Sequence, residues 1–130
     1  MTHDYPAELI VDLLARGHAV RFRAKGSSMH PVIRSDDYLH VEPIGEGEIE
    51  TGEVVLAFAE RGLTAHRVIR SGNGLVVTRG DNSLAADAPL EREAILGRVA
   101  WVDRDGEQKP VGPLSALELA ARRIRLRIRR

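Results

Sequence analysis

The chain has 130 residues, of which 43% are apolar and 29% are charged. A chain of this length suits one globular domain that buries about two thirds of its unfolded surface, so it needs no covalent staple. The absence of cysteine excludes disulfides, thiolate catalysis and cysteine-based zinc sites, and the formal net charge of zero argues against a surface built to bind nucleic acid.

The charged residues are unevenly placed. Residues 114–130 hold six arginines against one acidic residue, Glu118, and because the whole chain sums to zero, the rest of it is acidic. We expect at most a weak contact between this basic end and an anionic membrane surface, and no nucleic-acid partner. No stretch approaches the roughly 18 apolar residues of a membrane span, and no signal peptide is visible. The expected location is the cytoplasm or the periphery of a membrane.

The first part of the chain predicts a helix, a strand and a loop. Residues 6–16 place apolar side chains on one helical face, with Pro6 suited to the first turn and Gly17 to the stop. Residues 18–24 alternate as a half-buried strand does. The following Lys-Gly-Ser-Ser-Met-His-Pro-Val-Ile, at 25–33, interrupts the apolar pattern and predicts a loop.

Further segments have the composition of strands, and Gly, Asn, Asp or Pro separates most of them. They are residues 38–43, 53–59, 63–69, 74–79 and 94–102. We expect hairpin turns at 60–62 and 71–74, a polar loop at 44–52 and an irregular connection at 80–93. The body of the protein is therefore predicted to be mainly β, a mostly antiparallel unit of about six strands.

The C-terminal segment predicts a second helix. Residues 115–118, Ser-Ala-Leu-Glu, form a capping box, and apolar residues keep helical spacing beyond it. The last seven residues also alternate, so their pattern fits a strand as well. We expect residues 1–113 to form one domain that begins with a helix, and residues 114–130 to form a basic helix after it.

Ser28 is a candidate nucleophile. A serine hydroxyl becomes nucleophilic only when a base takes its proton. A glycine-flanked loop directly before a proline can expose such a hydroxyl and direct backbone N–H groups toward an oxyanion. The alternative is that Ser28 is simply a turn residue.

A base and a carboxylate for this serine are also available. His66 lies in a predicted strand and is a candidate general base, although a half-buried strand histidine is an equally ordinary interpretation. Asp81 and Asp87 are candidates for the carboxylate that would hold the histidine ring, and they could equally be a turn cap and a solvated loop residue. His30 is a rival base. The histidines show no metal-ligand spacing, so we expect no metal and no cofactor.

Four segments resemble the sequence boxes of one family. Residues 26–43 resemble the G-x-S-M-x-P box of type I signal peptidases and of the wider group that includes self-cleaving repressors. Gly-Glu-Val-Val-Leu-Ala-Phe at 52–58 is similar to the family's G-D-V-V strand, His-Arg-Val-Ile at 66–69 stands at its Lys-Arg-Val box, and Arg-Gly-Asp-Asn-Ser at 79–83 resembles its G-D-N box. The four boxes occur in the family order over roughly residues 20–103.

The resemblance implies a fold and an activity. The fold would be coiled antiparallel β-sheets around an elongated substrate groove. The activity would be that of a serine endopeptidase cleaving a leader or signal peptide with small residues before the cut. Because a histidine replaces the usual lysine, the chain resembles the branch that includes endoplasmic-reticulum and archaeal members and a minority of bacterial ones. By position, Ser28 would be the nucleophile and His66 the base, Asp87 matches the branch's supporting acid, and Asp81 would shape the turn.

The resemblance also assigns supporting roles around Ser28. Met29 would pack under the loop and Pro31 would fix its exit. The family usually has a small hydroxyl residue where this chain has Gly26, and Ser27 replaces the usual glycine. The oxyanion hole would then depend on backbone N–H groups, the Ser28 amide first. The chain shows no N-terminal membrane anchor, so we expect a soluble relative or a fragment.

Two other functions stay open at this point. A self-processing regulator of the same superfamily would cleave its own linker or a partner's, but no helix-turn-helix segment precedes the predicted domain. A non-catalytic peptide-binding module could keep the same fold, but the chain retains the serine, histidine and aspartate that such a module would not need.

Overall fold

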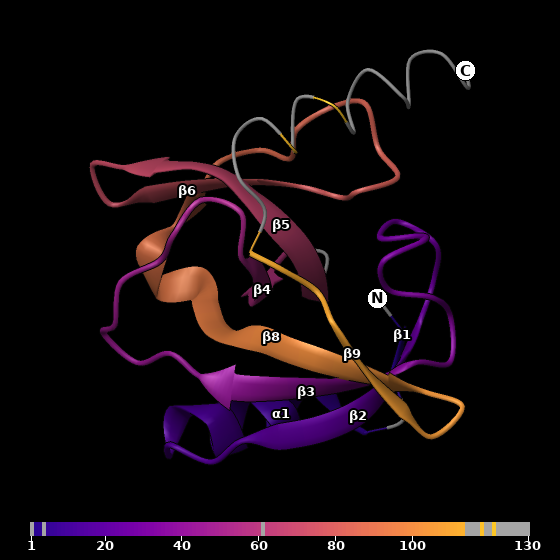
Figure 1. Ribbon diagram of the computed structural model, residues 1–130. Helices are drawn as coiled ribbons and strands as arrows, with labels where there is room; N and C mark the ends of the chain where they lie inside the picture. The colour runs from indigo at the N-terminus through magenta and orange to yellow at the C-terminus, as the bar shows by residue number, and fades with distance from the viewer. Residues whose placement is uncertain (1, 4, 61, 114–117, 119–120, 122–130) are drawn as a thin grey trace.

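The computed structural model describes residues 2–3, 5–60, 62–113, 118 and 121 (Figure 1). Its elements, in chain order, are β1 (Thr2–His3), α1 (Ala7–Ala15), β2 (Val20–Lys25), β3 (Tyr38–Pro43), β4 (Val54–Ala59), β5 (Gly62–Gly72), β6 (Leu75–Arg79), β7 (Leu90–Glu91), the 3-10 helix η1 (Arg92–Ala94), β8 (Ile95–Arg104) and β9 (Glu107–Pro110). The predicted mainly β fold with an N-terminal helix is confirmed.

The sequence patterns missed the short elements. The six predicted strands correspond to β2, β3, β4, β5, β6 and β8. β1 and β7 are two residues long, and β9 (Glu-Gln-Lys-Pro) has no apolar alternation, so none of the three carries a periodic signal. The segment predicted to be an irregular connection, 80–93, ends in β7 and the start of η1. The predicted C-terminal helix lies outside the described residues, apart from Glu118 and Ala121.

The described strands form one antiparallel sheet, in the order β1-β2-β3-β8-β4-β5-β6-β7, with β9 paired to β8. β8 joins the two halves of the sheet, because one of its edges pairs with β3 and the other with β4. The register shifts twice along β8, where Ala100 and Leu96 have no partner in β3 and β4, and once in β5 at Ile69; such bulges increase local twist. Figure 1 shows the result: β2, β3 and β8 occupy the lower half of the molecule, and β5 and β6 the upper half.

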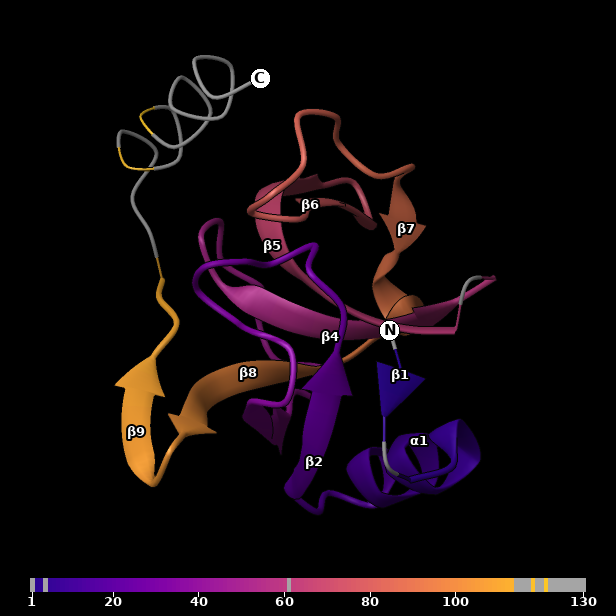
Figure 2. The same cartoon turned by 90° about the vertical axis from the view of Figure 1, so that its right-hand side faces the viewer.

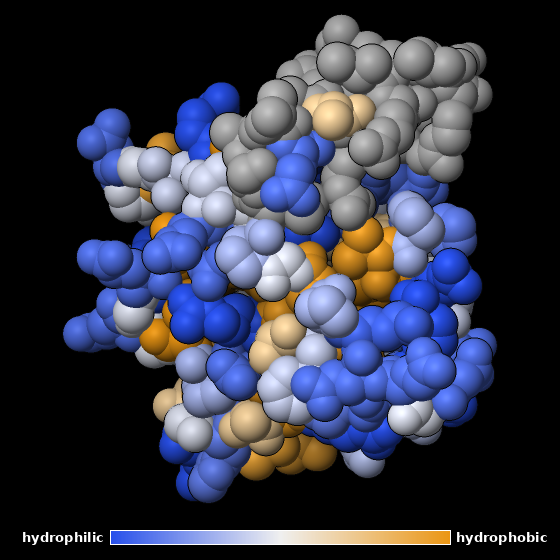
Figure 3. Space-filling view, viewed as in Figure 1, coloured by the Kyte–Doolittle hydropathy of each residue, from blue (hydrophilic) through white to orange (hydrophobic). Residues whose placement is uncertain are grey.

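Two clusters of buried side chains hold the sheet together. The larger cluster joins Ile10 and Leu14 of α1 to residues of β2, β3, β4, β5 and β8, and the smaller cluster joins β4, β5, β6 and β8. Val54 and Leu56 belong to the larger cluster, whereas Val55 belongs to the smaller one. β4 is therefore covered on both faces, which explains its unbroken apolar run. The outer surface is mostly hydrophilic on the face shown in Figure 3.

The described residues include no helix that is both long enough and apolar enough to cross a membrane. α1 has nine residues, and its buried side chains are directed at the sheet.

The close approach of β8 to β3 gives a test of the packing. A Cβ atom on Gly97 would lie 2.5 Å from the Glu42 carbonyl oxygen and 2.8 Å from a Val41 methyl group. We expect Gly97→Ala to lower the free energy of unfolding by about 1–3 kcal/mol, because neighbouring backbone has to shift. Gly72, also in a strand, has no atom within 4 Å of its added Cβ and serves as the matched control. Urea unfolding of both variants measures the difference, and equal losses would contradict this packing.

Candidate active site

Ser28 lies in a loop that is anchored on both sides of it. After β2, the His30 N–H donates to the Ser27 carbonyl at 3.1 Å, and the Ile33 N–H donates to the Met29 carbonyl at 3.1 Å. The Met29 and Ile33 side chains are buried in the larger core cluster. Ser28, between the hydrogen-bonded Ser27 and the buried Met29, is exposed. The loop therefore holds its backbone on the core and leaves the Ser28 hydroxyl at the surface.

His66 lies on β5, and its side chain contacts the Ser28 hydroxyl. Along β5, Ala65 and Arg67 are buried, whereas His66 between them is partly exposed. The His66 Nε2 atom lies 3.0 Å from the Ser28 Oγ atom. In Figure 2 the loop that follows β2 passes in front of β5, which brings together residues 38 positions apart in the chain.

Asp87 lies on the other side of the histidine ring. Its Oδ2 atom is 2.5 Å from His66 Nδ1, and the same oxygen accepts a hydrogen bond from the Thr78 hydroxyl at 2.7 Å. An ionised carboxylate can only accept, so Nδ1 carries the proton and Nε2 is left free to accept from Ser28. Ser28, His66 and Asp87 thus form a series of hydrogen bonds in the arrangement that a serine nucleophile requires.

Asp81 has a different partner. Its carboxylate receives two hydrogen bonds from the Arg67 guanidinium, at 2.9 and 2.8 Å, and both side chains are 1% exposed. The remaining Arg67 nitrogen donates to the carbonyls of Gly52 and Val111, each at 2.8 Å. The Asp81 N–H lies 3.3 Å from the Met29 sulfur. Asp81 therefore binds the turn after β6 to the core and to the Ser28 loop.

The turn after β6 touches the Ser28 loop directly. The Asn82 N–H donates to the Ser28 carbonyl at 2.9 Å, and the Asn82 side-chain amide donates to the Ser27 carbonyl at 3.2 Å. A Cβ atom on Gly80 would lie 2.5 Å from the Ser28 carbonyl oxygen and 3.2 Å from His66 Nε2. Only glycine fits so close to both groups, so the turn can pack directly against the Ser28 loop.

The other candidates lie around this arrangement. Gly26 and Ser27 are exposed, and Gly26 has a positive φ of 114° as the chain leaves β2. The Lys25 ammonium is bound to Asp36, and this hydrogen bond holds the pKa of the Asp36 carboxyl below its usual range. His30 is exposed, and the histidine in contact with the Ser28 hydroxyl is His66.

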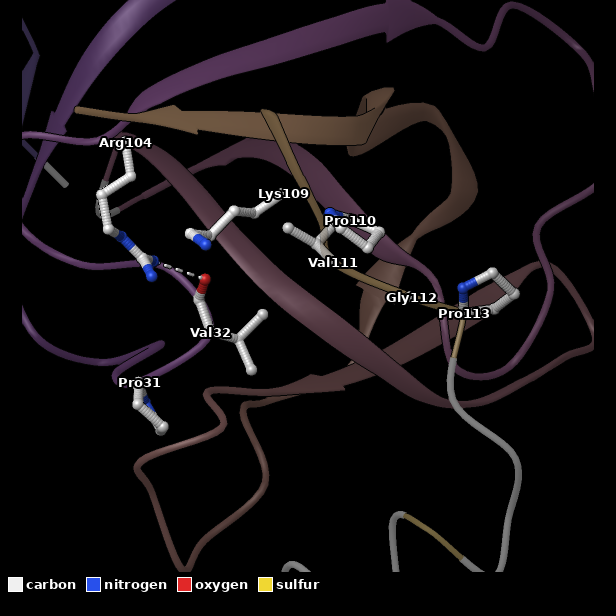
Figure 4. A pocket seen from close by; sticks show the side chains of 8 residues that line it. All are labelled: Pro31, Val32, Arg104, Lys109, Pro110, Val111, Gly112 and Pro113. Atoms are coloured by element: carbon white, nitrogen blue, oxygen red, sulfur yellow. Dashed lines mark hydrogen bonds between the residues drawn. The ribbon is translucent and has the colours of Figure 1, made fainter. Parts of the chain in front are cut away.

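Pro31 and Val32 line a pocket of about 480 Å³ beside the loop, together with residues 109–113 and Arg104 (Figure 4). Arg104 donates to the Val32 carbonyl at 3.1 Å and to both oxygens of the buried Asp37, which raises the pKa of the guanidinium. Hydrogen bonds therefore hold the Arg104 side of the pocket in place. Ser28 is not among the residues that line this pocket. Across the described residues, no three His, Asp or Glu side chains are gathered as metal ligands.

The comparison with protein families decides the relationship. The family model described as Peptidase S24-like matches residues 3–100. The chain belongs to the S24-like peptidase family. This family lies in the signal peptidase and self-cleaving repressor superfamily, so the resemblance seen in the sequence is confirmed. The comparison with curated proteins gives no match. The matched residues of this S24-like peptidase include Ser28, His66 and Asp87.

Sequence reasoning missed the groups that hold the site in place. Arg67 falls on the same face of β5 as Leu63 and Ala65, and a charge among core residues signals a buried partner. Thr78 gave no such signal, and Gly80 stood out only as part of the G-D-N box, since the contacts of both residues are with residues distant in the chain. The positions of these residues follow only from the packing of the sheet.

The Arg67–Asp81 pair gives a test of this support. We expect Arg67→Met to lower the free energy of unfolding by about 3–5 kcal/mol, because it leaves the Asp81 carboxylate buried without its partner. Arg16, whose side chain is 70% exposed and paired with Asp12, is the matched control, and Arg16→Met should cost less than about 1 kcal/mol. Urea denaturation followed by circular dichroism compares the two. Similar losses would show that the buried pair has no special weight.

Proposed function

We propose that this S24-like peptidase is a serine endopeptidase that cleaves extended leader or signal peptides. In this proposal Ser28 is the nucleophile, His66 is the general base, and Asp87 orients the histidine. The observation that carries it is the continuous series of contacts, with Ser28 Oγ 3.0 Å from His66 Nε2 and His66 Nδ1 2.5 Å from Asp87.

The chemistry follows from the direction of these hydrogen bonds. His66 Nε2 takes the Ser28 proton as Oγ attacks the carbonyl carbon of the scissile peptide bond. The Asp87 carboxylate stabilises the imidazolium that forms. The imidazolium then gives its proton to the leaving amine, so the C–N bond breaks and an acyl-enzyme remains. Water, activated by the same histidine, hydrolyses the ester and restores Ser28.

The oxyanion is assigned to backbone donors, with the Ser28 N–H first. This N–H belongs to the same peptide group as the Ser27 carbonyl, which accepts from the Asn82 side chain at 3.2 Å. Since a trans peptide group is planar, holding its carbonyl also sets the direction of its N–H. Asn82 therefore supports an orientation of this donor that is fixed before substrate arrives, which is what oxyanion stabilisation requires.

The free edge of β5 suits an extended substrate. Residues 62–66 pair with β4 on one side, and pairing with β6 begins only at Arg67. Within the described part of the chain, no strand pairs with the other edge of 62–66. A peptide that adds as a strand there would use backbone hydrogen bonds and pass His66. The family resemblance implies that the substrate has small residues just before the scissile bond.

Self-processing is a second candidate, favoured by the match to the S24-like family, whose superfamily includes self-cleaving repressors. The two candidates differ in their substrate, not in the chemistry of Ser28. Intact-mass measurement of the purified chain separates them. A fragmentation rate that does not change on dilution indicates cleavage of the chain by itself, and a stable chain that cleaves added peptides indicates an endopeptidase.

The nucleophile assignment is tested by the two adjacent serines. We expect Ser28→Ala to lower the rate of peptide cleavage by about 10⁴-fold or more while the protein stays folded. Ser27→Ala, which removes a neighbouring exposed hydroxyl, should keep most of the activity. A peptide library with quenched fluorophores measures both, and a fluorophosphonate probe should label the Ser27→Ala variant but not Ser28→Ala. Equal losses in the two variants would rule out Ser28 as the specific nucleophile.

The base assignment is tested by pH. Because only neutral His66 can accept the Ser28 proton, kcat/KM should rise as the pH increases from acid toward neutral. His66→Ala should be inactive, Asp87→Asn should be folded but slowed by about 10³-fold or more, and His30→Ala should retain activity. An activity that survives His66→Ala, or keeps rising to about pH 10 where lysines lose their protons, would point to a different base.

A further inference from the structure

Asp87 needs a positioning partner because its own segment is irregular. It lies between the turn after β6 and β7, and a third of its side chain is exposed, 33%, against 12% for His66. A carboxylate on such a segment would otherwise rotate between solvent and the histidine ring. The orientation of His66 would then vary with it.

Thr78 makes contacts with both the backbone and the side chain of Asp87. The Asp87 N–H donates to the Thr78 carbonyl at 2.8 Å, and the Thr78 hydroxyl donates to Asp87 Oδ2 at 2.7 Å. Thr78 is 3% exposed and lies on β6, where it pairs with Val68 of β5. A group on the sheet thus holds Asp87 at two points.

The direction of the hydroxyl hydrogen bond matters. Oδ2 is the atom that accepts from His66 Nδ1, at 2.5 Å, so the threonine and the histidine converge on one oxygen. The Thr78 hydrogen bond therefore fixes the oxygen that accepts the Nδ1 proton, and Nε2 is left free to receive the Ser28 proton.

We propose that Thr78 is a positioning residue of the peptidase, whose buried hydroxyl holds the Asp87 carboxylate in the orientation that keeps His66 ready to act as a base. Thr78 binds Asp87, and its effect on His66 passes through that carboxylate. This inference rests on the proposed function, because it assigns a role within the same Ser28–His66–Asp87 series.

Two substitutions at Thr78 separate the hydroxyl from the bulk of the side chain. Thr78→Val keeps the shape and loses the donor, whereas Thr78→Ser keeps the donor. We expect Thr78→Val to lower kcat about 10- to 100-fold with KM little changed, because a misplaced catalytic group loses rate rather than affinity. Thr78→Ser should stay within about threefold of the parent protein. Thr51→Val, which removes an exposed hydroxyl in the turn before β4, is the matched control and should not change kcat.

A second measurement does not depend on activity. In proton NMR of the resting protein, the hydrogen-bonded His66 Nδ1 proton should give a signal far downfield. The signal should disappear in Asp87→Asn, be lost or moved upfield in Thr78→Val, and be retained in Thr78→Ser and Thr51→Val. Melting curves confirm that each variant is folded.

The two measurements distinguish failure of the inference from failure of the proposed function. An unchanged signal and unchanged kcat in Thr78→Val, or an equal loss of both in Thr78→Ser, would overturn the role of the hydroxyl while the peptidase assignment stands. If the parent protein cleaves no peptide but Thr78→Val still loses the downfield signal, the positioning of Asp87 by Thr78 holds and the proposed endopeptidase activity fails.

Discussion

The buried ion pair between Arg67 and Asp81 is the constraint on which the rest of the site depends. The two side chains are 1% exposed and share two hydrogen bonds. The third guanidinium nitrogen, Nη1, donates to the backbone carbonyls of Gly52 and Val111. Such a pair need not stabilise the protein more than apolar residues of the same size would, but it tolerates only one geometry, because either charge alone would be buried at a cost of several kcal/mol.

That geometry places the groups of the proposed catalytic series because of where the pair lies in the chain. Arg67 follows His66 directly on β5, and Asp81 stands between Gly80 and Asn82. Alternation along the strand sends Arg67 into the core and His66 to the opposite face. The turn held by Asp81 contacts the Ser28 loop through Asn82. Fixing one buried contact therefore sets the relative position of β5, the turn after β6 and the nucleophile loop.

The site combines an exposed serine, the proposed nucleophile, with buried supports. Ser28 is exposed and Asp87 is partly exposed, so a substrate can reach the reacting groups. Arg67, Thr78 and Asp81 are buried, and their hydrogen bonds are not weakened by exchange with water. Membership of the S24-like peptidase family agrees with this division between a rigid scaffold and an accessible hydroxyl.

The sequence by itself determined the class of the fold, the six longer strands, the N-terminal helix and the superfamily. These depend on local periodicity and on short boxes of residues that can be recognised without knowing what lies beside them. It also placed Ser28 in a loop, His66 on a strand and both candidate carboxylates after β6. β1, β7 and β9 could not be predicted, since strands of two to four residues owe their existence to the partner strand and not to their own pattern.

Only the tertiary structure decided which carboxylate meets the histidine. Asp81 and Asp87 were both reasonable partners for His66, because spacing along an irregular segment does not fix the direction of a side chain. In the folded protein Arg67 binds Asp81 on the buried face of β5. Asp87 lies at the other face, where Thr78 and His66 both contact one of its oxygens. The reason is physical: a buried guanidinium takes the carboxylate that can be desolvated with it, which leaves the more exposed one for the histidine at the surface.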